Sequence, residues 1–274
     1  MQTIKRMEEN GIEWKRMSNV VLVETKGSVC YVTINRPDKL NALSWEVWQE
    51  LGKAFDAFEK SDARVCVLSG SGKKAFVAGA DIDAYRTMSA KDFSEFIVEA
   101  GKIANRIYEI PKPFIAAIYG YALGGGLELA LHCDLVVANK SAKLGLPEAN
   151  LGLLPGGGGT QIVPRLIGVA KTNDMIMRGR WLRGEEALNC GLISSVFDDE
   201  KYEEELAEYV AEVLKRAPLA VGVLKKLVRE GLDLPLFDAL NLEIELTAPL
   251  IETEDGREGV GAFIEKRPAD FKGR

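Results

Sequence analysis

Apolar residues along the chain form short runs that predict strands. The runs at 20–25 and 29–34, separated by Gly27-Ser28, predict two strands joined by a tight turn. Similar short runs recur at 65–68, 114–118, 135–138 and 193–196. Runs with little polar alternation are typical of parallel strands that are buried on both faces.

Helical periodicity lies between several of these runs. Ser44 precedes a helical pattern and is expected to cap it. The apolar stripe of that predicted helix consists of Val47, Leu51, Ala54, Phe55 and Phe58. Residues 92–108 and 127–132 also have helical patterns. Short buried strands that alternate with helices predict an α/β fold.

The last quarter of the chain is mostly helical in pattern. The predicted helices cover residues 202–215, 219–230, 237–252 and 257–265. No long linker precedes them, so we expect one structural unit with an α/β core at 19–200 and a helical C-terminal region at 201–274. The polar residues 1–18 are expected to form a flexible N-terminal arm.

Composition excludes several classes of protein. The chain has 274 residues, of which 47% are hydrophobic and 28% charged, as in an ordinary globular protein. A net charge of −6 argues against a dedicated nucleic-acid binder. No apolar run is long enough for a transmembrane helix, and the N-terminus lacks the apolar segment of a secretory signal. We therefore expect neither nucleic-acid nor membrane partners.

The four cysteines are widely spaced, and the chain has a single histidine. This pattern indicates neither a zinc site nor a disulfide framework, so no metal is expected. Free thiols are typical of a reduced compartment, which favours a cytoplasmic location. The single histidine, His132, has no partner nearby in sequence and is expected to pack on a helix.

The segment at 70–75 spells G-x-G-x-x-A after a predicted strand, which resembles a dinucleotide fingerprint. A nucleotide site of this type requires a helix to begin there, and the following residues 76–81 do not open one. The phosphate-loop pattern also requires Ser or Thr after the first lysine, where this chain has Lys74. The nucleotide interpretation is therefore disfavoured.

Three glycine-rich segments, at 78–82, 120–128 and 145–160, are the strongest candidates for chemistry. In the second, a buried strand leads through Gly124, Gly125 and Gly126 into a helical pattern. Unpaired N–H groups at a helix start can hold an anion or a developing oxyanion. Alternatively, the three glycines serve tight packing of helix on strand.

Two glutamates lie in these apolar, glycine-rich surroundings. Glu128 falls in the first turn of the predicted helix, and Glu148 follows Pro147. Like charges held close together raise one pKa, which leaves one acid and one base near neutral pH. Adding water across a double bond requires such a pair. On its own, each glutamate also fits a structural role, Glu128 at a helix dipole and Glu148 in a loop.

At these residues the chain resembles the crotonase (enoyl-CoA hydratase/isomerase) superfamily, from about residue 20 to 274. The motifs that carry the resemblance include Asn35-Arg36-Pro37, Leu40-Asn41-Ala42-Leu43, Ala78-Gly79-Ala80-Asp81-Ile82, the segment 120–128, Pro147-Glu148, Leu154-Pro155-Gly156, Gly159-Thr160-Gln161, Glu258-Gly259 and Glu265-Lys266-Arg267. Many motifs in one order make the match specific to the family, and less specific to one reaction.

The resemblance implies a crotonase-like spiral of ββα turns and a C-terminal helical region used for trimerisation, as a homotrimer or a dimer of trimers. It implies an acyl-CoA substrate and no separate cofactor, because CoA is part of the substrate. By position, the backbone N–H groups of Ala80 and Gly125 would form the oxyanion hole, and Gly156 would help to place water. Glu128 and Glu148 occupy the positions of the glutamate pair that marks hydratases.

The resemblance also implies a CoA-binding set, which consists of Leu40, Ala42, Ala78, Asp81, Ile82, Phe263 and Lys266. The last two resemble residues that reach the CoA of the same or a neighbouring subunit. Tyr85 stands near the acyl pocket, where an aliphatic residue is frequent, and Asp83 stands where many hydratases have lysine. These departures leave the acyl-chain preference open.

The expected function is therefore that of a 2-enoyl-CoA hydratase. Two enzymatic alternatives remain, a double-bond isomerase and a hydratase of a specialised cyclic dienoyl or carnitinyl thioester. An RNA-binding or scaffold protein on this fold is the alternative from another class. The net charge of −6 disfavours it, and it leaves the glutamate pair unexplained.

Overall fold

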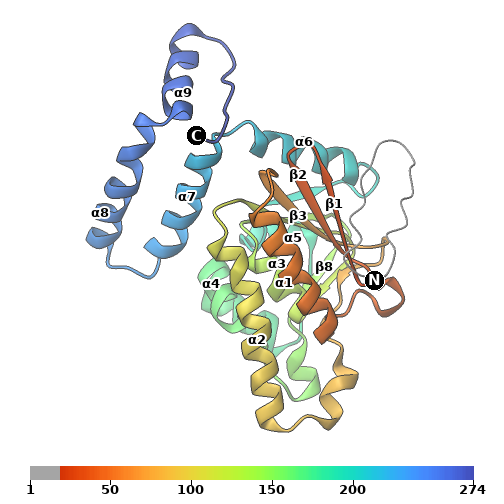
Figure 1. The fold of residues 1–274 in the computed structure, drawn as a ribbon. Coiled ribbons are helices and arrows are strands. Elements are labelled where there is room, and N and C mark those ends of the chain that lie inside the picture. Colours follow the sequence, from red (N-terminus) through yellow and green to blue (C-terminus); the bar gives the residue numbers. More distant parts are fainter. Residues whose placement is uncertain (1–18) are drawn as a thin grey trace, which may run out of the picture.

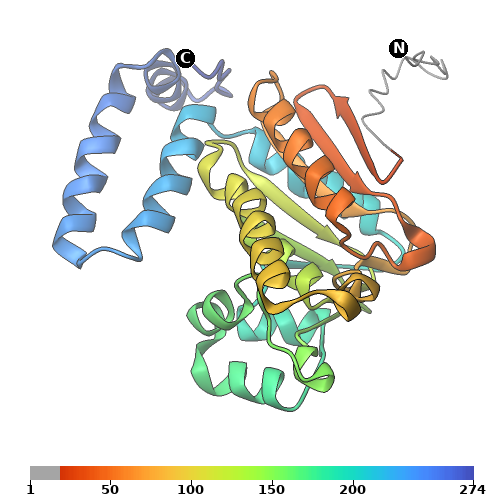
Figure 2. The same cartoon turned by 60° about the horizontal axis from the view of Figure 1, so that its bottom comes forward.

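The computed structural model describes residues 19–274, and the predicted arm at 1–18 lies outside the described residues. Figures 1 and 2 show a core of strands and helices, with the last helices set to one side. The larger sheet has the order β1-β2-β3-β5-β7-β10. Its strands are β1 (Val21–Lys26), β2 (Val29–Ile34), β3 (Val65–Gly70), β5 (Phe114–Ile118), β7 (Leu135–Asn139) and β10 (Ser195–Phe197).

The larger sheet confirms the predicted α/β fold. β1 and β2 form an antiparallel hairpin, and all later neighbours in the sheet pair in parallel. On β3, Cys66 and Leu68 belong to one core cluster, whereas Val65 and Val67 belong to a second cluster that α6 (Tyr202–Leu214) covers. Both faces of β3 are thus buried, which explains its continuous apolar run.

A smaller sheet with the order β4-β6-β8-β9 was not foreseen from the apolar runs. Its strands are β4 (Ala75–Val77), β6 (Tyr121–Leu123), β8 (Lys143–Gly145) and β9 (Leu182–Arg183). The pairs β3/β4, β5/β6 and β7/β8 each place one strand in the larger sheet and the next strand in the smaller one. A helix follows each pair, so the ββα turns of the resemblance are present.

Three helices cover one side of the larger sheet and border the site described below. They are α1 (Trp45–Glu59), α2 (Ala90–Glu109) and α3 (Gly125–His132). Ser44 caps α1 as predicted, because its Oγ accepts a hydrogen bond from the Val47 amide at 3.3 Å. The five residues of the predicted apolar stripe of α1 are all buried.

Two other helices in the core were not predicted. They are α4 (Gly159–Met177) and α5 (Gly184–Cys190). α4 contains Pro164 and is kinked at Gly168, whose φ of 78° and ψ of 160° are not helical. These breaks hide the helical periodicity of the segment. The strand expected at 193–196 lies slightly later, at Ser195–Phe197.

The C-terminal region is helical, as predicted, and after α6 it continues with α7 (Pro218–Gly231), α8 (Leu236–Thr247) and α9 (Glu254–Glu265). Both views show α8 and α9 standing away from the sheets (Figures 1 and 2). The single helix expected over 237–252 was wrong. α8 ends at Thr247 and a 3-10 turn covers Ala248–Glu252, because Pro249 lacks the N–H that a continued helix needs.

α7 is fastened to the core through a buried ion pair. Lys225 Nζ lies 2.9 Å from Asp134 Oδ2. Arg229, one turn later, donates to the His132 carbonyl oxygen at 2.8 Å. These contacts hold α7 against the C-terminal end of α3, the helix whose start borders the site described below.

The structure excludes the nucleotide interpretation of residues 70–75. These residues make the turn between β3 and β4, and no helix begins there. Separately, none of the helices within residues 19–274 combines the length and the apolar sequence needed to cross a membrane.

Candidate active site

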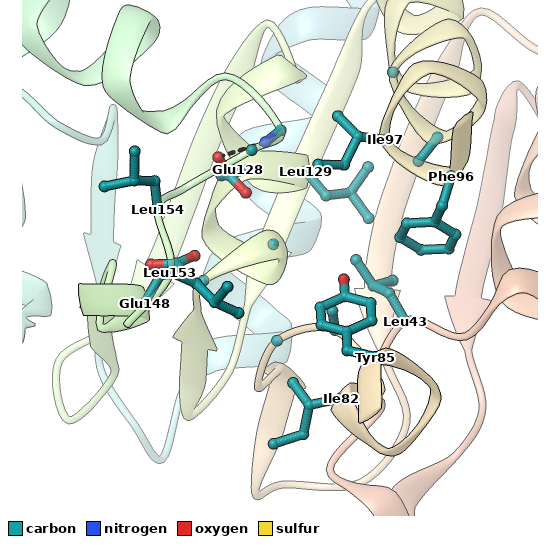
Figure 3. Close-up of a pocket in the computed structure, with 18 of the residues that line it drawn as sticks. Leu43, Ile82, Tyr85, Phe96, Ile97, Glu128, Leu129, Glu148, Leu153 and Leu154 are labelled. Carbon is teal, nitrogen blue, oxygen red and sulfur yellow. Dashed lines mark hydrogen bonds between the residues drawn. The ribbon is translucent and has the colours of Figure 1, made fainter. Parts of the chain in front are cut away.

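The three glycine-rich segments meet at one cavity of about 240 Å³. The first segment contributes Ala78, Gly79 and Ala80, the second Gly124, Gly125 and Glu128, and the third Pro147, Glu148, Gly156 and Gly157. The opposite wall comes from α2 and from the 3-10 helix η2 (Ile82–Thr87). Figure 3 shows Glu128 and Glu148 on one side of this cavity, with Leu153 and Leu154 beside them, and Tyr85, Phe96 and Ile97 on the other side.

The start of α3 explains the run of three glycines. Gly124 caps the helix with a φ of 52°, and a Cβ built on it would lie 2.9 Å from Glu148 Oε1. A Cβ on Gly126 would overlap the Val77 carbonyl oxygen, so this glycine permits close packing on β4. The packing interpretation is therefore confirmed at Gly126, and Gly124 leaves room for the Glu148 carboxyl. The oxyanion site at this helix start stays a prediction.

The amides of Ala80 and Gly125 lie close together on the cavity wall. A Cβ built on Gly125 would be 3.9 Å from the Ala80 nitrogen and 4.0 Å from Glu128 Oε2. Hydrogen bonds of 2.9 Å on either side of Ala80, from Leu43 N to Gly79 O and from Asp81 N to Leu43 O, fix its segment. Within residues 19–274 neither the Ala80 nor the Gly125 amide has a protein acceptor. Both N–H groups are therefore available to a ligand oxygen.

Glu128 is held in place by the backbone of the third glycine-rich segment. Its side chain is buried, and its Oε1 accepts hydrogen bonds from the amides of Gly157 and Gly159, both at 2.8 Å. Burial raises the pKa of Glu128, and the two N–H donors oppose that shift by favouring the carboxylate. The carboxylate is thus fixed in orientation, with Oε2 4.0 Å from a Cβ built on Gly125.

Glu148 begins the 3-10 helix η3 (Glu148–Leu151), and its environment differs from that of Glu128. Its Oε2 is buried and has no hydrogen-bond partner within residues 19–274. Burial raises the pKa of Glu148 to about 7, and the charge of Glu128 adds to the shift. The sequence predicted this split through repulsion between like charges, whereas burial makes the larger contribution.

Tyr85 lines the cavity between the glutamates and two phenylalanines. Its ring makes edge contacts with Phe93 and Phe96, at centroid distances of 5.0 and 5.9 Å. Its hydroxyl points into the cavity (Figure 3). Burial, followed by the charges of Glu128 and Glu148, raises the pKa of Tyr85 to about 12. The hydroxyl is therefore protonated at neutral pH and can donate a hydrogen bond.

His132 packs at the end of α3, as predicted. Its Nδ1 lies 2.9 Å from the Glu128 carbonyl oxygen and therefore carries the proton. Its ring stacks on Tyr108 with a centroid distance of 4.9 Å, and burial lowers its pKa. The neutral ring also lines the cavity, which the sequence did not indicate because α3 and α2 are separate in the chain.

Comparison with known proteins identifies the family. The family model described as enoyl-CoA hydratase/isomerase matches residues 24–274. The chain belongs to this family. It is 36% identical over 258 residues to the short-chain-enoyl-CoA hydratase of Clostridium acetobutylicum, which covers 93% of this chain and 99% of the relative.

Two further similarities extend over most of the chain. The mitochondrial methylglutaconyl-CoA hydratase of Mus musculus is 40% identical over 259 residues, which are 92% of this chain and 82% of the relative. A crystal structure of enoyl-CoA hydratase from Bacillus anthracis superimposes with a TM-score of 0.89 at 35% identity. That match covers 93% of this chain and 100% of the solved one.

The CoA-binding residues that the family resemblance implies fall into three groups in the structure. Ala78 and Ile82 line the cavity. The second group adjoins the cavity and consists of Leu40, Ala42 and Asp81. The Leu40 carbonyl oxygen accepts a 3.0 Å hydrogen bond from the Ala78 amide. Arg36 links Ala42 and Asp81, because it donates to the Ala42 carbonyl oxygen at 2.6 Å and to the Asp81 carboxylate at 2.7 Å. The Asp81 side chain thus braces the loop beside the cavity.

Phe263 and Lys266 form the third group, at the end of α9. Phe263 is 85% exposed, and neither residue lines the cavity of its own chain. The structure brings Glu128, Glu148, Ala80, Gly125, Gly156 and Tyr85 together around one cavity. In residues 19–274 no three His, Cys, Asp or Glu side chains gather as a possible metal site.

Proposed function

We propose that this protein is a 2-enoyl-CoA hydratase, which adds water reversibly across the 2,3 double bond of an acyl-CoA thioester. One observation carries the proposal: two carboxyl groups in different electrostatic environments border the same cavity as two backbone amides that find no protein acceptor in the described part of the chain. The names of the relatives, which include a short-chain-enoyl-CoA hydratase and a crotonyl-CoA hydratase, support the same reaction.

The two amides act on the thioester. The N–H groups of Ala80 and Gly125 donate to its carbonyl oxygen and stabilise the enolate-like charge that develops during addition. Their separation and orientation are fixed by the bridge between Leu43 and Ala80 and by the start of α3. A preorganised donor of this kind typically lowers a barrier by about 3–4 kcal/mol.

The glutamates act on water and on the substrate carbons. Glu128, as the carboxylate, takes a proton from water as the water oxygen bonds to C3. Glu148, as the acid, gives its proton to C2. A carboxyl with a pKa of about 7 is suited to this donation, because it is protonated in a large fraction of molecules near neutral pH. CoA enters as part of the substrate, and the reaction requires no separate cofactor.

Product analysis in deuterated water tests the reaction type. With 2-butenoyl-CoA we expect 3-hydroxybutyryl-CoA that carries one deuterium at C2. With 3-enoyl-CoA we expect no conversion at a comparable rate. Formation of 2-enoyl-CoA from the 3-enoyl isomer, without hydration of 2-butenoyl-CoA, would show that the protein is an isomerase instead.

We also infer a homo-oligomer, a trimer or a dimer of trimers, located in the cytoplasm. Large apolar side chains lie exposed on α7, α8 and α9, among them Leu224, Phe237, Ile244, Phe263 and Ile264. A separate exposed set on and beside α4 includes Val169 and Met177. Two different apolar faces on one chain favour a head-to-tail contact, which closes into a ring at the appropriate rotation. All four cysteines are free, as expected in a reduced compartment.

Light scattering tests the assembly. The unmodified protein is expected to have three or six times the 30.0 kDa mass of the chain. Phe237→Glu, which places a charge on a side chain that is 79% exposed in the single chain, is expected to lower that mass. A mass equal to one chain for the unmodified protein would contradict the inference.

A further inference from the structure

We propose that the cavity continues past the glutamate pair as an apolar branch along α2, and that this branch takes uncharged acyl chains longer than four carbons. Gly101 determines how much chain the branch can hold. The inference rests on the proposed function, since it concerns the acyl group of the same substrate. It adds a substrate class and a specificity-determining residue.

The wall of the branch on α2 consists of small side chains. Ala100 and Ala104 lie one turn apart and are 8% and 4% exposed, and Gly101 lies between them on the same face. Ile97 begins this face near the catalytic loop, because its Cδ1 lies 3.0 Å from a Cβ built on Gly156. The branch therefore runs from the catalytic loop along α2, away from Tyr85.

Gly101 has no structural reason to be glycine. It lies in the middle of a helix of 20 residues, and its φ is not positive. Glycine in such a position costs about 0.5–1 kcal/mol relative to alanine. A Cβ built on Gly101 would meet no atom within 4 Å, whereas one on Gly52, on the neighbouring α1, would touch Ile103 at 3.6 Å. No neighbouring side chain packs into the space beside Gly101, and this space is part of the cavity.

The far end of the branch is apolar or uncharged. His132, which stacks on Tyr108 beyond Ala104 on α2, lines it, and this histidine is neutral because burial lowers its pKa. Trp48 and Leu129 add apolar lining to the same cavity. In the part of the chain that the structure describes, the residues lining the cavity include no lysine or arginine. A carboxylate at the end of the acyl chain would find no cation there, so burial favours a hydrocarbon tail.

Binding of saturated thioesters tests the branch independently of catalysis. Calorimetry with butyryl-CoA and octanoyl-CoA is expected to show that octanoyl-CoA binds at least about tenfold more tightly, because four more methylenes are buried. Gly101→Leu is expected to reduce this ratio to about one. The matched control is Val98→Leu, since Val98 lies on the same helix, is 51% exposed and does not line the cavity. This control is expected to keep the wild-type ratio.

The same variants are then compared in hydration of 2-butenoyl-CoA and 2-octenoyl-CoA. We expect Gly101→Leu to lower the ratio of kcat/KM for the longer over the shorter substrate by about tenfold or more, and Gly101→Ala to lower it less. Equal binding of both thioesters by the wild type, or a Gly101→Leu variant with the wild-type ratio, would overturn the inference. Chain-length-dependent binding without any hydration would overturn the proposed reaction and leave the acyl branch in place.

Discussion

The two walls of the cavity are built in different ways. Around Glu128, the positions that matter are backbone groups, namely the amides of Ala80, Gly125, Gly157 and Gly159. Along α2, the wall is made of side chains and of the space that Gly101 leaves open. Backbone groups of a folded core are fixed by its hydrogen bonds, whereas a side-chain wall changes with each substitution.

This difference separates two functions within one cavity. In the proposed reaction, the backbone wall fixes where charge is stabilised and where the base points, so it determines which reaction takes place. In the same proposal the α2 wall contacts no reacting atom, so its size can vary without changing the reaction. Substitutions on the first wall should therefore reduce kcat, whereas those on the second should change which substrates are accepted.

Removing one amide of the backbone wall should have a large effect. Gly125 is the first residue of α3, a position that accepts proline without disturbing the helix. Gly125→Pro removes the N–H, and we expect kcat for 2-butenoyl-CoA to fall about 10²–10³-fold. Gly125→Ala is the matched control, because its Cβ would make contacts no closer than 3.6 Å and the N–H remains. Equal rates in the two variants would contradict a role for this amide.

Displacing the base without removing it should have a smaller effect. A Cβ on Gly157 would lie 2.9 Å from Glu128 Oε2, so Gly157→Ala must move the carboxylate. We expect kcat to fall about 10–100-fold, because small misplacements of a catalytic group are costly. Gly52→Ala, outside the cavity, should retain the wild-type kcat. An unchanged kcat in Gly157→Ala would show that the position of Glu128 is not critical.

The protonation states of the pair predict the pH dependence. Glu148 has a pKa of about 7 and is the proposed proton donor, so kcat/KM for hydration should fall above about pH 7, approaching tenfold per unit. Glu128 must be ionised, and burial raises its pKa, so the rate should also fall on the acid side. The two apparent pKa values of such a profile describe the coupled pair of glutamates and not each glutamate separately. A rate that continues to rise through pH 9 would be inconsistent with Glu148 as the acid.

The smallest effect is expected on the stability of the protein when the α2 wall is altered. Gly101→Ala should raise the free energy of unfolding by about 0.5–1 kcal/mol, since alanine favours the helix and finds open space. Denaturant titration of the variant and the wild type measures the difference. A destabilised variant would show that the space beside Gly101 is needed by the protein itself.

Much of the fold could be predicted from the sequence because it depends on local patterns. The stripe on α1 and the apolar runs of β3 and β5 are each visible within one segment. The smaller sheet could not be predicted in this way, since its strands have two or three residues, too few to show periodicity. The break after Thr247 was missed although Pro249 marks it.

The sequence was enough to predict which residues form the candidate site, but not the contacts that hold them in place. Glu128 and Glu148 stand in conspicuous glycine-rich segments, and the family resemblance assigned them. The bonds from Gly157 and Gly159 to Glu128 join residues 29 and 31 positions apart, and no local pattern specifies such contacts. Gly101 gave no signal, because a single glycine within a helical pattern has meaning only once the neighbouring space is known.

The central claim is that Glu128 and Glu148 together add water to an enoyl thioester. The most direct test follows the loss of the enoyl absorbance of 2-butenoyl-CoA with the wild type, Glu128→Gln and Glu148→Gln, alongside binding of butyryl-CoA to each. We expect rapid hydration by the wild type, a loss of about 10²–10⁴-fold in each variant, and retained binding. A near-normal rate in either variant, or no hydration by the wild type, would contradict the account.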